Sequence, residues 1–357
     1  MDIKKISRVS KNSLKSAKNL AIRNSGKPMK PRWLVFMPTG NCNSHCQHCN
    51  IWQNPPKSKP LSLKEITQAL QDPLFKNICE IINTGGEVSL RNDLAEIIYI
   101  EHKILPKAKL QMSTNALLPQ KILDVSKRLL KNNIPISIGV SLDGIGEKHD
   151  KIRGVPGNFK KADFLLKELV SLRKKYSKNL EFAIGFTLSD LTLESLNEVN
   201  DYGKKLDIDV LVQYYNQSPF YGNNNSQLNI NKKLYNAVAS FEPSFLKEMW
   251  LSSLKGKFFK FPCFALNTFF VLTWAGDIVP CLNYFDISAG NIREKNPSEI
   301  WKSKEAQQIR KMAKRCKGCL NQWAYGWSLE SCTFPVFSFY LKNPKKLIER
   351  FKQRGIE

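Results

Sequence analysis

The sequence predicts an α/β fold, a partial (β/α)6 barrel followed by a small C-terminal cysteine-rich domain. Three observations support this fold class. Apolar strand-like segments and amphipathic helical segments alternate six times between residues 33 and 215. Polar or glycine-rich motifs follow several predicted strands, and a second group of cysteines begins after the alternation has ended. Strands that alternate with helices form parallel βαβ units, and six units leave a barrel incomplete.

The alternation places each barrel strand and helix by residue number. The predicted strands are short apolar runs at residues 33–37, 78–84, 109–113, 134–141, 181–187 and 208–214. Helical patterns lie between them, for example at residues 62–71, 119–131, 158–175 and 192–205. In such barrels the chemistry takes place where strands end. The motifs at 42–49, 84–87, 114–115 and 141–144 all follow predicted strands, so we expect them to share one site.

The chain divides into five predicted regions. A basic N-terminal extension (1–30) precedes the barrel (31–217), and a bridging region (218–260) begins in an Asn-rich stretch. The cysteine-rich domain (261–332) follows, and an aromatic and basic tail (333–357) comes last. This order predicts one large catalytic or binding domain with a smaller module behind it.

Composition limits the possible classes of protein. No apolar run reaches the roughly 18 residues of a membrane-spanning helix, and the lysine-rich N-terminus lacks the apolar block of a secretory signal. We therefore predict a cytoplasmic protein. Five of its nine cysteines lie in two tight groups, a distribution that favours metal or redox chemistry over disulfides. The formal charge of +24 permits acidic partners without choosing among them.

The N-terminal extension has the pattern of a basic amphipathic helix. Ile6, Val9 and Leu14 share one side of a helical wheel with other apolar residues, while several cations lie on the other side. Two interpretations remain open. The helix packs on the barrel with a solvated face, or it rests with the basic tail on an anionic membrane surface at the inner leaflet.

Three closely spaced cysteines form the first candidate metal site. Cys42, Cys46 and Cys49 have CxxxCxxC spacing, and iron–sulfur clusters are held by such thiolates. Three ligands leave one iron of a four-iron cluster open to another molecule. A zinc site with His45 or His48 as its fourth ligand is the alternative.

Two further motifs accompany these cysteines. Gly85, Gly86 and Glu87 combine close backbone approach with a carboxylate that can bind an ammonium group. A later motif begins at Ser141 and ends at Arg153. The guanidinium of Arg153 can bind a carboxylate through two parallel hydrogen bonds.

Together, the three motifs resemble the radical S-adenosylmethionine (SAM) superfamily, whose fold is a partial TIM-like barrel. The resemblance implies a SAM-binding [4Fe–4S] cluster held by the three cysteines. It implies that Gly85, Gly86 and Glu87 bind the SAM amino group, that Ser141 contacts the ribose, and that Arg153 pairs with the carboxylate. His48 stands where an aromatic residue usually contacts adenine, and Val88 and Ala116 also depart from the common motifs. The backbone of Leu188 is a further candidate for adenine contact.

The second group of cysteines resembles the SPASM domain in its shortened "twitch" form, which carries one auxiliary cluster. The resemblance implies a second [4Fe–4S] cluster held by Cys263, Cys281, Cys316 and Cys319. A structural zinc site with four cysteines is the alternative. We predict a buried, inert thiol at Cys79. Cys332 remains open between a structural thiol, a spare ligand and a hydrogen-atom donor.

The resemblance also implies the chemistry. SAM accepts an electron at the open iron, and the resulting 5′-deoxyadenosyl radical abstracts a hydrogen atom from the substrate. A flavodoxin or ferredoxin is the implied electron donor, and the auxiliary cluster serves electron transfer. A dehydrogenase or epimerase acting on a sugar, cyclitol or lipid-linked molecule is ranked slightly before a peptide maturase, because no leader-binding domain precedes the barrel. A sulfatase maturase is less favoured, since it would need two auxiliary clusters. Candidate pocket residues are Gln213, Tyr214 and Tyr215.

The alternative from a different class of protein is a non-catalytic binder. A non-catalytic zinc or iron–sulfur protein could bind nucleic acid through its positive charge. Such a binder has no need to assemble Glu87, Ser141 and Arg153 around a cluster, and no nucleic-acid-binding motif is visible. No specific nucleic acid is therefore predicted as a partner.

Overall fold

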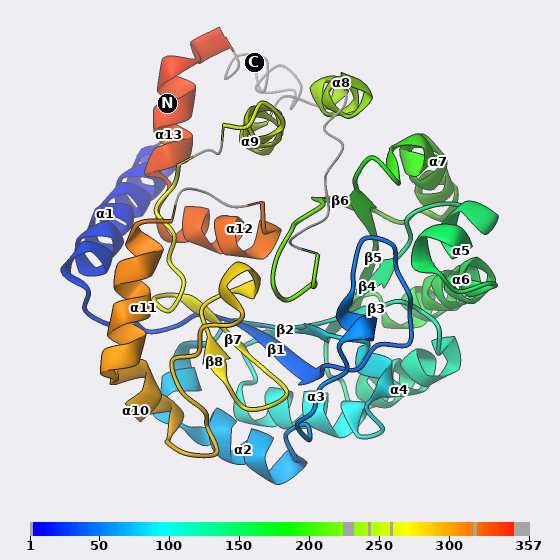
Figure 1. Cartoon of the computed structure of the whole chain (residues 1–357), viewed down its shortest axis with the longest axis horizontal. Coiled ribbons are helices and arrows are strands. Elements are labelled where there is room, and N and C mark those ends of the chain that lie inside the picture. The colour runs from blue at the N-terminus through cyan, green and yellow to red at the C-terminus, as the bar shows by residue number, and fades with distance from the viewer. Residues whose placement is uncertain (1–2, 224–231, 242–243, 258–259, 317–319, 346–357) are drawn as a thin grey trace.

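A curved sheet of eight strands forms the centre of the molecule in the computed structural model, which describes residues 3–223, 232–241, 244–257, 260–316 and 320–345. The strand order is β6-β5-β4-β3-β2-β1-β7-β8. The first six strands are parallel to their neighbours and span Trp33–Thr39, Glu80–Gly85, Lys109–Thr114, Ile136–Ser141, Leu180–Leu188 and Val210–Tyr214. Because β6 and β8 do not pair, the barrel is open, which confirms the predicted fold class (Figure 1).

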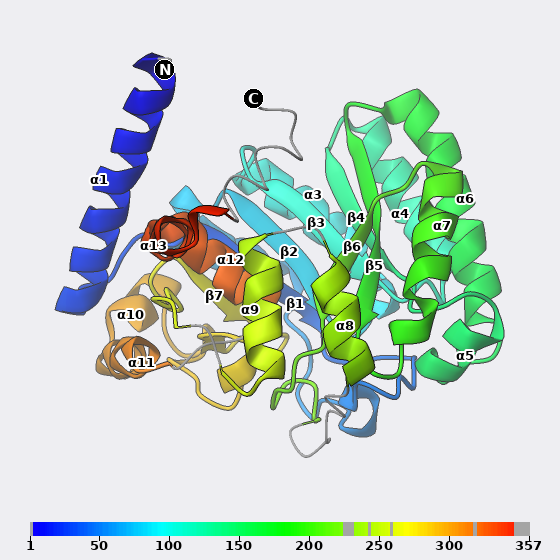
Figure 2. The same cartoon turned by 90° about the horizontal axis from the view of Figure 1, so that it is seen from above.

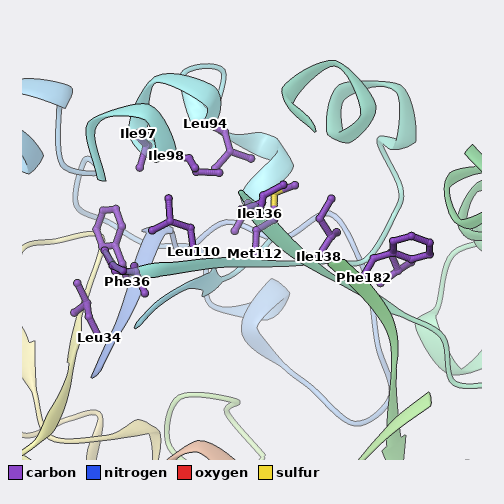
Figure 3. Close-up of a cluster of buried hydrophobic side chains, with 14 of the residues drawn as sticks. Leu34, Phe36, Leu94, Ile97, Ile98, Leu110, Met112, Ile136, Ile138 and Phe182 are labelled. Carbon is purple, nitrogen blue, oxygen red and sulfur yellow. The ribbon is translucent and has the colours of Figure 1, made fainter. Parts of the chain in front are cut away.

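Helices cover the outer face of the six barrel strands. These helices are α2 (Leu63–Gln71), α3 (Leu94–Ile104), α4 (Pro119–Lys131), α6 (Asn158–Tyr176) and α7 (Leu196–Leu206). Figure 3 shows the buried apolar layer between sheet and helices, in which Ile97 and Ile98 of α3 face Leu110 and Met112 of β3. Burial of each such side chain contributes about 1.5–3 kcal/mol to folding. This layer holds the strand ends in a fixed register.

Local sequence signals set several helix ends. Ser62 and Glu65 form a capping box at the start of α2, with the Glu65 carboxylate accepting from the Ser62 backbone N–H. Pro119 occupies the first turn of α4, where a missing N–H costs nothing. Both helices begin within one residue of the predicted position.

The C-terminal module continues the barrel sheet. Its strand β7 (Phe269–Leu272) pairs in parallel with β1, Trp33 opposite Phe269, and β8 (Ile278–Val279) returns antiparallel. Its helices are α10 (Pro297–Lys302), α11 (Lys304–Lys314) and α12 (Gln322–Ser331), and the predicted tail begins with α13 (Phe334–Lys342). The module and the barrel therefore share one sheet.

The predicted bridging region forms two helices on the open side of the barrel. They are α8 (Lys232–Ser240) and α9 (Phe245–Leu254), which pack against each other (Figure 2). Trp250 of α9 packs against Tyr214 at the end of β6, with ring centroids 5.6 Å apart. This contact ties the bridge to the last barrel strand.

The N-terminal extension is a long helix, α1 (Ile3–Ser25), which packs on the C-terminal module (Figures 1 and 2). It contacts α11 and α12, the Ser16 hydroxyl bonds to the Thr333 hydroxyl, and Asn19 donates to the Ser331 carbonyl. Leu14 points away from this contact, with 72% of its surface exposed. The interpretation that α1 packs on the protein is supported, with the module in place of the barrel as its partner.

In the described part of the chain, no helix is both long and apolar enough to cross a membrane.

Candidate functional site

A cavity lies at the carboxyl ends of the barrel strands, where the sequence motifs predicted a shared site. The residues that follow β1 contribute Cys42, Cys46, His48 and Cys49 to its wall. The ends of β2 to β5 contribute a second group, which includes Gly85, Gly86, Glu87, Asn115, Ser141 and Thr187. The opposite wall consists of Gln213, Tyr214, Tyr215, Asn216 and Tyr221, together with the start of α12 at 320–323.

The two glycines after β2 allow the cysteine loop to cross the end of that strand. A β-carbon at Gly86 would overlap the carbonyl group of Asn41, and Gly85 has a φ of +120°. The Glu87 N–H donates to the Asn41 carbonyl at 2.7 Å. The glycines therefore place the residue before Cys42 directly against the strand end.

Glu87 is buried and rigidly oriented by three donors. Its carboxylate accepts hydrogen bonds from the Thr114 hydroxyl at 2.7 Å, the Asn115 N–H at 2.7 Å and the Ser89 N–H at 3.0 Å. Thr114 and Asn115 follow β3, so that motif orients the carboxylate at the end of β2. A carboxylate held in this way is a preorganised partner for a cation.

The three predicted cluster ligands line the same cavity. Burial raises the pKa of the Cys42 thiol to about 11 and that of the Cys49 thiol to about 12. The Cys46 sulfur lies 3.1 Å from the Ser44 hydroxyl and 3.8 Å from Nη1 of Arg153. The Cys42 and Cys49 thiols would ionise on binding a metal, because metal coordination deprotonates thiols.

Arg153 ends the short helix α5 (Glu147–Arg153) and forms a buried ion pair with Asp143. Their side chains approach to 2.7 Å, and both are almost fully buried. Burial lowers the pKa of a guanidinium, but the Asp143 carboxylate and the Cys46 sulfur raise the pKa of Arg153 above its ordinary value. Arg153 therefore stays a cation beside the cysteine loop.

His48 and Leu188 occupy different environments. His48 lines the cavity, with Nε2 3.9 Å from the Asp143 carboxylate, and burial lowers its pKa to about 4, so its imidazole is neutral. The Leu188 side chain lies in the core, and its carbonyl accepts from the Tyr215 N–H at 3.0 Å. Thr187, the preceding residue, faces the cavity.

Sequence reasoning assigned no role to two residues that organise this site. Asp143 accepts the Thr187 N–H at 2.8 Å in addition to pairing with Arg153. Asn223 donates its side-chain amide to the His48 carbonyl, the Tyr215 hydroxyl and the Asn216 carbonyl. Of the two, only Asp143 could have been found from the sequence, because it lies within the motif at 141–144.

Three of the four predicted auxiliary ligands gather in the C-terminal module. Cys263, Cys281 and Cys316 lie near enough that their charges act on one another. Burial, with smaller contributions from neighbouring sulfurs, raises the pKa of Cys263 to about 11 and that of Cys281 to about 12. Cys319 lies outside the described residues.

The two remaining cysteines lie in apolar surroundings. Cys79 precedes β2 and is half-buried, where full burial was predicted, and its thiol donates to the Arg32 carbonyl at 3.2 Å. Its inert role stays a prediction. Cys332 caps α12 and is 1% exposed. Burial raises the pKa of the Cys332 thiol, and the charge of Arg23 on α1 acts in the opposite direction.

The described donor groups fit iron–sulfur clusters. Among the described residues, no group of three or more His, Cys, Asp or Glu side chains is close enough to hold a single metal ion. Gly86 lets the cysteine loop approach the end of β2 closely, and the cation Arg153 lies beside Cys46. Both features suit an anionic cluster in the cavity.

Comparison with known proteins finds a matching family for the barrel and for the C-terminal module. Residues 36–210 match the model of the radical SAM superfamily, and residues 263–320 match that of the SPASM iron–sulfur cluster-binding domain. The fold and these matches define an iron–sulfur protein built on a partial α/β barrel. The chain belongs to the radical SAM superfamily and carries a C-terminal SPASM domain. Its cofactors are accordingly [4Fe–4S] clusters and SAM.

Curated relatives match over part of their length. The subtilosin biosynthesis protein AlbA of Bacillus subtilis is 34% identical over 135 residues, which is 36% of this chain and 28% of AlbA. The sporulation killing factor maturation protein SkfB of the same organism is 22% identical over 161 residues, 45% of this chain and 37% of SkfB. The chain thus spans about a third of the length of these relatives.

Two solved structures share the fold. SuiB of Streptococcus suis, bound to its precursor peptide SuiA, has a TM-score of 0.63 at 17% identity, covering 86% of this chain and 76% of SuiB. The protein anSMEcpe, with AdoMet and a peptide bound, has a TM-score of 0.58 at 19% identity, covering 88% of this chain and 99% of anSMEcpe. At these identities the likeness establishes the fold.

Proposed function

We propose that this chain is an enzyme that uses SAM and its barrel cluster for hydrogen-atom abstraction from a peptide substrate. The main support for this proposal is that one cavity is lined by Cys42, Cys46 and Cys49, by Glu87 and by an uncharged wall. The three cysteines would hold the cluster. Residues that would bind SAM are Gly85, Gly86, Glu87, Ser141 and Arg153, with His48 and the backbone near Leu188 toward the adenine. When bound, the reduced cluster and SAM supply a 5′-deoxyadenosyl radical, which removes a hydrogen atom from substrate.

The protein groups in this proposal bind and orient. Glu87, held by Thr114 and Asn115, presents a carboxylate to the amino group of SAM. Arg153 offsets the negative charge of the thiolates from its position near Cys46. Its outer nitrogens are already directed at Asp143 and Cys46, while Nε has no hydrogen-bond partner among the described residues. Nε and the second N–H of each outer nitrogen are therefore the donors of Arg153 that remain for the SAM carboxylate.

The first prediction tests the cluster ligands. Anaerobically reconstituted protein, reduced and given SAM, is expected to produce 5′-deoxyadenosine, and the Cys42/Cys46/Cys49→Ala variant is expected to produce none. Mass spectrometry measures the product, and iron analysis should show about half the iron in the variant, because one of two clusters is lost. A parallel reaction replaces the chemical reductant with flavodoxin or ferredoxin, the proposed donors. Equal product from variant and native protein would contradict the ligand assignment.

Two features support a peptide as the substrate. AlbA is named for biosynthesis of the antilisterial bacteriocin subtilosin and SkfB for maturation of a sporulation killing factor, and the SuiB structure contains a precursor peptide. The wall opposite the cluster carries side-chain amides of Gln213, Asn216 and Gln322 beside aromatic rings, and among its described residues none is charged. Amides can pair with peptide bonds. The same wall would also suit a sugar, the substrate class that the sequence slightly favours over a peptide.

A second prediction separates these substrate classes. Extract from the cells that make the protein is expected to stimulate 5′-deoxyadenosine formation by native enzyme, and protease treatment of the extract should abolish the stimulation. A Gln322→Glu variant, which places a charge on the wall, should respond less to the same extract, since a buried charge without a partner is costly. Stimulation that survives protease and passes a small-molecule filter would favour a sugar, cyclitol or similar substrate.

We further propose that an anionic membrane surface is a partner. Lys15 and Lys18 are exposed on α1, and Leu14 beside them is largely exposed. Phe337 and Leu341 of α13 are also exposed, next to Lys342. Each cation near anionic lipid contributes about 1 kcal/mol. Together these residues give the two neighbouring helices an apolar and basic surface.

A flotation experiment tests this partner without removing α1, which packs on the module. Native protein is expected to float with phosphatidylserine-containing liposomes, and a Lys15→Glu/Lys18→Glu variant should float several-fold less. Neutral liposomes serve as the control. Absence of flotation by native protein with anionic lipid would exclude the membrane surface as a partner.

A further inference from the structure

Arg23, near the end of α1, is a buried cation that reaches into the C-terminal module. It lies outside both segments matched by the family models. Its side chain is almost fully buried, its Nε donates to the Cys263 carbonyl at 2.7 Å, and Nη2 donates to the Ala313 carbonyl at 3.4 Å. The guanidinium also lies 5.8 Å from the Phe264 ring centroid. A side chain from the N-terminal helix therefore contacts the backbone of a proposed auxiliary ligand.

The charge of Arg23 has no carboxylate partner among the described residues. Its polar contacts are backbone carbonyls and the Asn24 side chain. Burial lowers the pKa of Arg23, while the sulfurs of Cys263, Cys332 and Cys316 act in the opposite direction. A buried charge without a counter-charge is costly. An anionic group beside Arg23 in the loaded protein would offset that cost.

We propose that Arg23 is a positioning residue for the auxiliary cluster, fixing the Cys263 segment and supplying a positive charge that raises the reduction potential of the cluster. This inference rests on the auxiliary ligands in the proposed function. A cluster held by four thiolates carries net negative charge, and reduction adds one more. A nearby cation in surroundings of low dielectric favours the reduced form. α1 thereby becomes part of the redox site as well as a packing element.

Redox titration of the auxiliary cluster tests the proposal directly. The background is full-length protein with Cys42/Cys46/Cys49→Ala, so that the auxiliary cluster is the one observed by electron paramagnetic resonance. Adding Arg23→Gln is expected to shift the midpoint potential to a more negative value. A tenfold change in the reduction equilibrium corresponds to about 59 mV for one electron. Arg23→Lys, which keeps the charge, is expected to restore most of the potential.

Arg310 provides a matched control in the same module. It is also buried, and it donates to the Leu266 and Trp301 carbonyls, and among the described residues no cysteine is one of its hydrogen-bond partners. Arg310→Gln should reduce thermal stability yet leave the potential unchanged. A shift of the same size in both variants would assign the effect to general loosening and overturn the inference.

Two other outcomes would also overturn it, in distinguishable ways. An unchanged potential in Arg23→Gln, with the cluster signal intact, would reject the role of Arg23 alone. Absence of any cluster signal in the Cys42/Cys46/Cys49→Ala background would reject the proposed auxiliary ligands, and the inference with them. Iron content measured beside each titration separates cluster loss from a change in potential.

Discussion

Replacing Asp143 with alanine is expected to lower the free energy of unfolding of the apo-protein by about 3–5 kcal/mol. Asp143 is fully buried and 2.7 Å from Arg153, and its other oxygen accepts the Thr187 N–H. Although burial acts to raise the pKa of this carboxyl, Arg153 holds it below the ordinary value, so the pair is ionised. Removal of Asp143 leaves a buried cation without a partner.

Urea unfolding of the apo-protein, followed by circular dichroism, measures the effect. An exposed ion pair supplies the control, since Glu96→Ala breaks the contact with Arg128 and should cost less than about 1 kcal/mol. The Asp143→Leu/Arg153→Met double variant removes both charges and should recover much of the lost stability. A cost for Asp143→Ala no greater than that for Glu96→Ala would show that the buried pair is not a determinant of stability.

The second large effect concerns the pH dependence of folding. Glu101 of α3 is fully buried against β2, where it accepts a hydrogen bond from Asn83 at 2.9 Å. Burial raises the pKa of Glu101 from 4.5 to about 8, despite that hydrogen bond. The folded protein thus keeps a proton on Glu101 that the unfolded chain releases near pH 4.5. Stability from this group is complete below pH 4.5 and falls by about 1.4 kcal/mol per pH unit as the pH rises toward 8.

Glu101→Gln is expected to remove this pH dependence, because an amide keeps the hydrogen-bonding shape of the neutral acid. The free energies of unfolding from urea titrations at pH 5 should agree between variant and native apo-protein within about 1 kcal/mol, whereas at pH 8.5 the variant should be more stable by a few kcal/mol. Glu198→Gln, on the surface of α7, should follow the native profile. Parallel profiles for native protein and Glu101→Gln would contradict a neutral Glu101.

Most barrel elements could be predicted because their cause is local. The period of apolar residues placed all six strands, and Pro119 marked the start of α4. The differences have local geometric causes as well. The strand predicted from residue 78 begins at Glu80, because Ile78 caps a short 3-10 turn at Pro73–Asn77. The helix predicted from residue 192 begins as another such turn, since the Thr192 hydroxyl bonds back to the Thr187 carbonyl.

The sequence by itself determined which residues gather at the strand ends. The spacing of Cys42, Cys46 and Cys49, and the positions of Glu87 and Arg153 after successive strands, required no coordinates. Parallel strands bring their carboxyl ends to one edge, so motifs that follow strands must converge there. For the same reason the superfamily could be inferred before the fold was known.

Only the tertiary structure decided what holds these residues in place. In the folded chain Arg153 forms an ion pair with Asp143, and the Asn223 amide donates a hydrogen bond to the His48 carbonyl. Arg23 of α1 donates to the Cys263 carbonyl. The basic N-terminal helix packs against the C-terminal module. Such contacts join segments far apart in the chain through single side chains. A single side chain leaves no periodic pattern, so only the packed fold reveals its partner.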